Sequence, residues 1–145
     1  MTYQINADPR VKILGNFSKH PVTIDGVTYK TSEHYFQASK FFETDPEWAK
    51  AIAEAPNPAR SKNMGNDRSH PIHPEWNRGE SIKMMLRVLL EKAKQNPEVL
   101  AVLKDTGTEL IAERADWDSY WGDGPDGNGK NMLGKLWMIV RDVLR

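Results

Sequence analysis

Three dipeptides in which a polar residue precedes proline constrain this chain more than any other feature. They are Asp45-Pro46, Asn57-Pro58 and Asn96-Pro97. A polar cap residue followed by proline at the first helical position is a strong helix start signal, because proline lacks only an N–H group that would be unpaired there. The sequence therefore predicts helices that begin at these three points. The residues expected to stop or follow them are Pro56, Gly65 and Gly107.

Two longer segments carry apolar residues at helical spacing. The first, at about 77–94, places Met85, Leu89 and Ala93 on one face, and the second, at about 131–144, does the same with Leu136 and Trp137. We interpret both stripes as core packing. A further helix is predicted from a cap at Ser32 to about Glu43.

Short strands are predicted at two places. Asp25-Gly26 lies between two β-branched runs, which is typical of a two-residue β-hairpin. Residues 110–112 are apolar and suit a short strand. The predicted fold class is mainly α, as a single domain over 1–145 with a small N-terminal β-hairpin.

Composition excludes several classes of function. With 145 residues, 20 basic and 20 acidic side chains, and a net charge of zero, the chain has no bulk attraction to nucleic acid or membranes. The absence of cysteine excludes disulfides, thiolate zinc sites and cysteine nucleophiles. The sequence contains no run of 18 apolar residues, so no membrane span is predicted, and residues 1–10 do not resemble a signal peptide. We expect a cytoplasmic protein.

The helix predicted from Ser32 has an unusual polar stripe. Glu33, Gln37 and Lys40 fall on one narrow strip of a helix that is otherwise largely apolar, a pattern that indicates burial on several sides. One interpretation is a local contact among these side chains on a solvated face. The other is a carboxylate and an amine that line a site, where apolar neighbours shift both pKa values.

Residues 117–131 form a glycine-rich loop that leads into the last helix. The end of this loop, 124–131, nearly matches the phosphate-binding loop of NTPases. Asn131 replaces the hydroxyl residue that would bind magnesium, and no apolar strand precedes the loop, so we reject that interpretation. We still expect Lys130 and the free amides of the helix start to suit a phosphate. A plain flexible loop is the alternative.

The segment 60–76 is basic and partly irregular. It contains Arg60 and Arg68 and ends at Trp76, which suits a phosphorylated ligand with a flat ring. An exposed polar loop is the alternative. His70 and His73 lie three apart across prolines and do not share a helical face, so no metal site is predicted.

The combination of these segments resembles one known family. The motifs are Asn16-Phe17, the run Thr-Ser-Glu-His-Tyr-Phe-Gln-Ala-Ser-Lys-Phe at 31–41, Tyr-Trp-Gly-Asp-Gly at 120–124, and Gly-Lys-Asn-Met-Leu-Gly at 129–134. Together with 59–76, they are similar to the NADAR family, also called YbiA-like, over about 14–141. The resemblance implies a mainly helical fold and an N-glycosidase that needs no cofactor or metal.

The resemblance also implies a substrate class and a set of site residues. Some members cleave early riboflavin-pathway ribosylamino-pyrimidine phosphates, and others remove ADP-ribose from guanine bases in nucleic acid. Glu33 matches the catalytic carboxylate, Lys40 the lysine of the same helix, and Trp76 and Asp123 further active-site positions. The residues that match the pocket wall are Asn16, Phe17, Trp121, Gly122 and Asn131.

The remaining predictions concern substrate binding. We expect Gln37 to contact substrate, and Arg60, Arg68 and Lys130 to hold its phosphate. The sequence departs from the family at Leu14-Gly15, where an aromatic-Ser or aromatic-Leu pair is common, and at Gly65-Asn66, where Gly-Arg is common. If that arginine contacts phosphate in the family, Arg68 or Arg60 must replace it here.

Two rival functions are compatible with the same residues. One is a module that binds ADP-ribose or a related nucleotide without cleaving it. The other is an interaction domain whose five tryptophans pack a core or a partner surface. Binding without cleavage leaves the ligand intact, whereas an interaction domain gains no thermal stability from a nucleotide.

Overall fold

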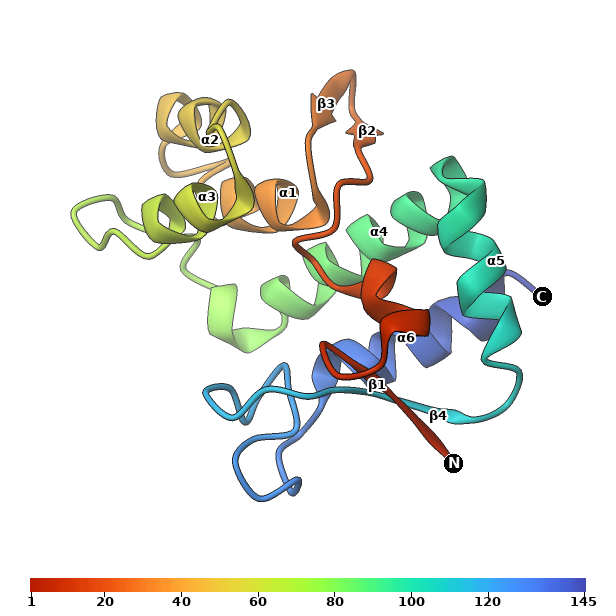
Figure 1. Cartoon of the computed structure of the whole chain (residues 1–145). Coiled ribbons are helices and arrows are strands. Elements are labelled where there is room, and N and C mark those ends of the chain that lie inside the picture. The colour runs from red at the N-terminus through yellow and green to blue at the C-terminus, as the bar shows by residue number, and fades with distance from the viewer. The chain divides into compact units, whose positions relative to one another are not determined.

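The computed structural model describes all 145 residues and is mainly α-helical, as predicted (Figure 1). The elements in chain order are β1 (Thr2–Ile5), the 3-10 helix η1 (Pro9–Leu14), β2 (Val22–Ile24), β3 (Val27–Tyr29), α1 (Ser32–Ser39), α2 (Pro46–Ala53), α3 (Pro58–Gly65), the 3-10 helix η2 (Trp76–Arg78), α4 (Glu80–Gln95), α5 (Pro97–Asp105), β4 (Leu110–Glu113) and α6 (Met132–Val143). No helix has the length and apolar composition needed to cross a bilayer.

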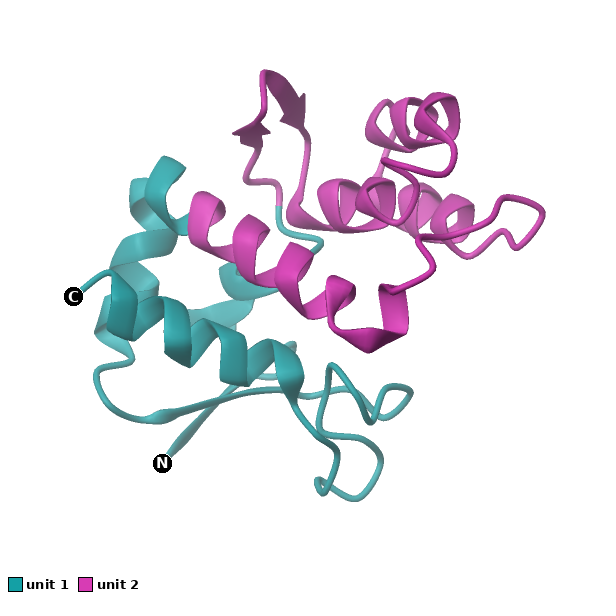
Figure 2. Ribbon diagram, turned by 180° about the vertical axis from the view of Figure 1, so that it is seen from behind, with its two compact units in different colours: residues 1–18, 93–145 teal, residues 19–92 magenta.

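The chain divides into two compact units, which Figure 2 shows in different colours. Unit 1 consists of Met1–Ser18 and Ala93–Arg145, and unit 2 consists of Lys19–Lys92. Unit 2 is therefore continuous in sequence, whereas unit 1 is built from both ends of the chain.

Unit 2 contains the predicted hairpin. Val22 pairs with Tyr29 and Ile24 with Val27 in an antiparallel register. Asp25 and Gly26 both have positive φ, at 53° and 81°, as the mirror-image hairpin turns require. Below the hairpin, α1 packs against α2 and α3, and its eight residues are all buried.

The polar-proline pairs begin helices as predicted. Pro46, Pro58 and Pro97 are each at the start of a helix. Asp45 accepts a hydrogen bond from the Trp48 amide and Asn57 accepts one from the Arg60 amide. Asn96 makes no such side-chain cap bond.

Several predicted helix limits were wrong. The first helix is capped by Thr31, whose hydroxyl accepts from the His34 amide, and not by Ser32. It ends at Ser39 rather than Glu43, because a turn reverses the chain before Asp45. The long helix begins at Glu80, after the separate 3-10 turn η2, and not near residue 77.

Unit 1 is organised by a parallel strand pair that the sequence analysis did not predict. Thr2 pairs with Leu110 and Ile5 with Glu113. The predicted strand at 110–112 is present and runs one residue longer, as β4. Helix α6 lies against β4, and its buried Trp137 donates from Nε1 to the Leu14 carbonyl at 2.9 Å.

Candidate active site

The polar stripe of α1 is buried rather than solvated. Glu33, Gln37 and Lys40 expose only 7%, 4% and 5% of their surface. Gln37 Nε2 donates to Glu33 Oε2 at 2.7 Å, so the local contact exists, but inside the protein. Burying a carboxylate and an amine is costly unless each is hydrogen-bonded. Such a pair, buried on one helix, is typical of a functional site.

Gly65 lets α1 and α3 approach closely. A Cβ atom at this position would lie 1.9 Å from Gln37 Oε1, so no larger residue fits without moving Gln37. Gly65 is the last residue of α3, and the cap that follows it is Asn66. The predicted role of Gly65 as a cap was therefore wrong: the position requires glycine because the two helices pack tightly there.

The Lys40 amine is held by the end of α3. Its Nζ donates to the Gly65 carbonyl and to Asn66 Oδ1, both at 3.3 Å. The same carbonyl accepts from Arg68 Nη1 at 3.0 Å. We call this set of Lys40, Gly65, Asn66 and Arg68 the Lys40 cluster. The roles of Gly65 and Asn66 were not predicted from the sequence, although a glycine at a helix end is also a signal of close packing.

Burial lowers the pKa of the Lys40 amine to about 8 from an ordinary value of 10.5. The neighbouring charges of Arg68 and Lys62 lower the pKa further, and the Glu33 carboxylate opposes them. The sequence alone leaves the direction of this pKa shift open, because Phe36 and Phe41 oppose Glu33, and the structure gives a downward shift. A lysine with this pKa is partly uncharged near neutral pH and is available as a nucleophile or base.

We expect Lys40 to be acylated with a midpoint near pH 8, because only the neutral amine reacts. Trace labelling with acetic anhydride at a series of pH values, read by peptide mass spectrometry, measures this midpoint. N-acetyl-lysine amide in the same tube is the reference and reacts with a midpoint above pH 10 on the ordinary scale. A Lys40 midpoint equal to that of the reference would contradict the buried position of the amine.

The segment after α3 folds back onto α1. The His73 amide donates to the Lys40 carbonyl at 2.8 Å, and the Trp76 ring lies 5.2 Å from the Phe36 ring. His70 stacks on Trp48 at 3.9 Å and pairs with the Asp45 carboxylate at 2.7 Å. Trp76 is 6% exposed, so its ring walls the α1 site rather than standing free in solvent.

In unit 1, Asp123 organises the glycine-rich loop. Its Oδ1 accepts from Arg114 Nη1 at 2.6 Å and from the Ala115 amide at 3.0 Å, and only 8% of the residue is exposed. Charge-assisted bonds of this kind are stronger than neutral ones and hold the carboxylate in one position. The structure thus shows that Asp123 fixes the loop. Its catalytic role stays a prediction.

Asn131 and the start of α6 are also engaged within unit 1. The Asn131 side chain donates to the Ile111 carbonyl and accepts from the Glu113 amide, each at 2.9 Å. The amides of Met132 and Leu133 donate to loop carbonyls. The prediction that these first amides of the helix are free to bind an anion was therefore wrong.

The other predicted binding residues differ in exposure. Arg60 is exposed in the first turn of α3, in unit 2. In unit 1, Lys130 is exposed with its Nζ 5.6 Å from the Tyr120 ring centre, and Phe17 is 47% exposed. Asn16 and Trp121 are half-buried, and Gly122 is buried where a Cβ would lie 2.7 Å from Ala115. Substrate contact at these positions stays a prediction.

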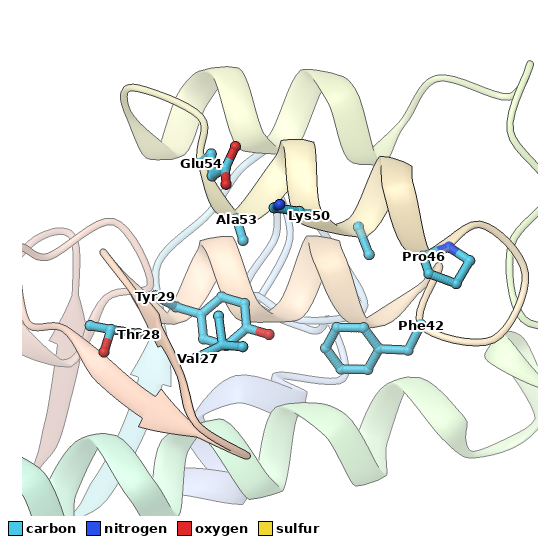
Figure 3. A pocket seen from close by; sticks show the side chains of 9 residues that line it. Val27, Thr28, Tyr29, Phe42, Pro46, Lys50, Ala53 and Glu54 are labelled. Carbon is cyan, nitrogen blue, oxygen red and sulfur yellow. The ribbon is translucent and has the colours of Figure 1, made fainter.

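A cavity of about 440 Å³ lies between the hairpin and α2 (Figure 3). Its walls are mostly apolar and include Tyr29, Phe42 and Ala49, with Lys50 and Glu54 also lining it. None of the predicted site residues lines it. Burial raises the pKa of the Tyr29 hydroxyl to about 12, so this hydroxyl remains protonated at neutral pH.

Comparison with known proteins decides the family. A family model described as the NADAR domain matches residues 4–145. The chain belongs to the NADAR family. The single domain expected over 1–145 of this NADAR chain stays a prediction.

Two relatives of this NADAR protein are informative. N-glycosidase YbiA of Escherichia coli (strain K12) is 41% identical over 131 residues, which cover 89% of this chain and 79% of that protein. The riboflavin biosynthesis protein VVA0006 of Vibrio vulnificus is 30% identical over 99% of this chain and 38% of its own, longer sequence. The NMR structure of E. coli YbiA superposes with a TM-score of 0.86 at 36% identity, over 99% of this chain and 83% of that one, which confirms the fold class.

Proposed function

We propose that this NADAR protein hydrolyses the C1′–N bond of a phosphorylated riboside, with Glu33 as its catalytic carboxylate. Its relatives are N-glycosidases, and the chain is an N-glycosyl hydrolase of the same class. The observation that carries the proposal is the burial of Glu33 in α1 together with Lys40 at the C-cap of the same helix. Glu33 and Lys40 both lie in unit 2, which also contains Trp76 and Arg68.

Glu33 supplies the electrostatic part of the reaction. As the base leaves, C1′ becomes positively charged, and a carboxylate beside it stabilises that charge and accepts a proton from the attacking water. The water oxygen bonds to C1′ as the C1′–N bond breaks, the base leaves with the electron pair, and the proton that Glu33 took from water passes to the base. Gln37 Nε2, 2.7 Å from Glu33 Oε2, holds the carboxylate in one orientation.

A second route uses Lys40, and the lowered pKa of its amine favours it. The neutral amine adds to C1′ as the C1′–N bond breaks and the base leaves with the electron pair and a proton. The sugar ring then opens to a protonated imine, which water hydrolyses to return the amine and the free sugar. Borohydride reduction during turnover would trap this imine as a stable adduct on Lys40.

Two substrate branches remain within the proposal. The riboflavin-related branch, ribosylamino-pyrimidine phosphates, is supported by the name of the Vibrio relative. The other branch is ADP-ribose on guanine in nucleic acid. In both, Arg60 and Arg68 of unit 2 are proposed to hold phosphate, although Arg68 already donates to the Gly65 carbonyl. Phosphate contact by Lys130, in unit 1, stays a prediction. A cytoplasmic location and the absence of a cofactor remain predictions.

The deciding experiment incubates the pure protein with one substrate of each branch. Mass spectrometry follows release of ribose 5-phosphate from the amino-pyrimidine ribosylamine phosphate and of ADP-ribose from modified DNA. Release from one substrate, lost in Glu33→Gln, would establish the activity and choose the branch. Tight binding with both substrates intact after long incubation would instead favour the non-catalytic nucleotide-binding module.

A further inference from the structure

The Lys40 amine has two oxygen acceptors, and both come from the end of α3. Nζ lies 3.3 Å from the Gly65 carbonyl oxygen and 3.3 Å from Asn66 Oδ1. The carbonyl belongs to a backbone that close packing against Gln37 fixes in place. The Asn66 acceptor is a side chain and is therefore the part of this arrangement that a substitution can change.

A neutral primary amine has two N–H bonds and one lone pair in a tetrahedral arrangement. When two acceptors take the two N–H bonds, the lone pair is left in the one remaining direction. With one acceptor alone, either N–H bond could meet that acceptor after rotation about the Cε–Nζ bond, so the lone pair would not be held in a single direction. Reactions of this kind depend steeply on such orientation.

We propose that Asn66 is a positioning residue, which orients the lone pair of the Lys40 amine for attack on the sugar carbon. The inference rests on the Lys40 route of the proposed function. Asn66 is itself exposed at the C-cap of α3, and it is not proposed to contact the reacting atoms. It acts through Lys40.

The charge of the acceptor matters as much as its position. The charged groups around the amine are Glu33 on α1, Lys62 on α3 and Arg68 after α3. Arg68 shares the Gly65 carbonyl with Lys40, so it places a second cation beside the amine. An uncharged amide at position 66 accepts the N–H bond without adding a negative charge. A negative charge there would favour the protonated form of the Lys40 amine.

Two variants separate orientation from charge. Asn66→Ala removes the acceptor, and we expect kcat to fall about tenfold or more at every pH with little change in KM. Asn66→Asp keeps an oxygen in place and adds a charge, so we expect both the acylation midpoint of Lys40 and the rising limb of the pH–rate profile to move up by about one pH unit. Above that pH, Asn66→Asp should recover most of the wild-type rate, whereas Asn66→Ala should not.

The control is Asn63→Asp, which places the same charge change on an exposed position of the same helix. We expect it to leave both profiles where they are in the wild type. Wild-type kcat in Asn66→Ala, or unchanged profiles in Asn66→Asp, would overturn the proposal. Circular dichroism confirms that each variant is folded.

The acylation measurement also separates this proposal from the proposed function. It needs no substrate, so a raised midpoint in Asn66→Asp together with no turnover in the wild type would support the contact between Asn66 and Lys40 but reject the activity. Full turnover in the wild type with an unchanged acylation midpoint in Asn66→Asp would support the activity but reject the contact between Asn66 and Lys40.

Discussion

Replacing Glu33 by glutamine is expected to lower turnover by about 100-fold or more, a typical loss for a carboxylate that stabilises developing charge or moves a proton. The fold should survive, because the new amide still has an oxygen that accepts from Gln37 Nε2, as Glu33 Oε2 does. Release of the free sugar phosphate over time, measured by mass spectrometry, gives the rate, and the thermal midpoint reports folding.

A matched control is available on the next helix. Glu47 lies in the first turn of α2, as Glu33 lies in the first turn of α1, but its side chain is exposed. Glu47→Gln makes the same change of charge at the same helical position and should leave turnover within about twofold, as most surface substitutions do. Near-full turnover in Glu33→Gln would show that Glu33 is not the catalytic carboxylate.

The same variant has a second, independent effect on Lys40. The Glu33 carboxylate raises the pKa of the Lys40 amine against the effect of burial. Its removal should therefore move the acylation midpoint of Lys40 to lower pH. An unmoved midpoint would indicate that the two groups do not interact across the α1 stripe.

Gly134→Ala is expected to destabilise the protein by about 3 kcal/mol or more, as overpacking against a fixed backbone does. A Cβ atom at this position would lie 2.1 Å from the Ile111 carbonyl oxygen and 2.5 Å from Asn131 Nδ2. To make room, α6 must move away from β4 and break the two bonds of the Asn131 side chain. The thermal midpoint should fall by about 6–12 °C for a chain of this size.

The expected loss of stability in Gly134→Ala is opposite in sign to what helix propensity alone predicts. Helix propensity alone predicts that glycine to alanine inside a helix stabilises by about 1 kcal/mol. Lys135→Ala, at the next and exposed position of α6, is the control and should change stability by less than about 0.5 kcal/mol. A rise of the thermal midpoint in Gly134→Ala would show that α6 and β4 are not packed as closely as described.

The predictions that succeeded were those that depend on local chemistry. Proline fixes its own backbone and needs no partner, so Pro46, Pro58 and Pro97 begin helices regardless of the rest of the chain. Asp25-Gly26 adopts positive φ for the same kind of reason. The burial of α1 was predictable because a helix with one narrow polar stripe has no broad face to offer to water.

The features that escaped prediction depend on partners far away in the sequence. Nothing near Thr2 indicates that it pairs with Leu110. The amides at the start of α6 were expected to be free, but the loop before the helix turns back and its carbonyls take them. The sequence marks Asn66 only as a departure from the Gly-Arg pair of the family. Its contact with Lys40 depends on how α1 and α3 pack, which the sequence does not show.

In the sequence, unit 2 lies between the two segments of unit 1, and this order has a consequence for how the chain folds during synthesis. Unit 2 is complete once Lys92 has been synthesised, so it can begin to fold while the ribosome is still at work. Strand β1 precedes unit 2 in the sequence, yet its partner β4 ends only at Glu113, and α6 follows β4. We expect β1 to stay unpaired until β4 has been synthesised, which makes the closing of unit 1 a later and slower event of folding than the folding of unit 2.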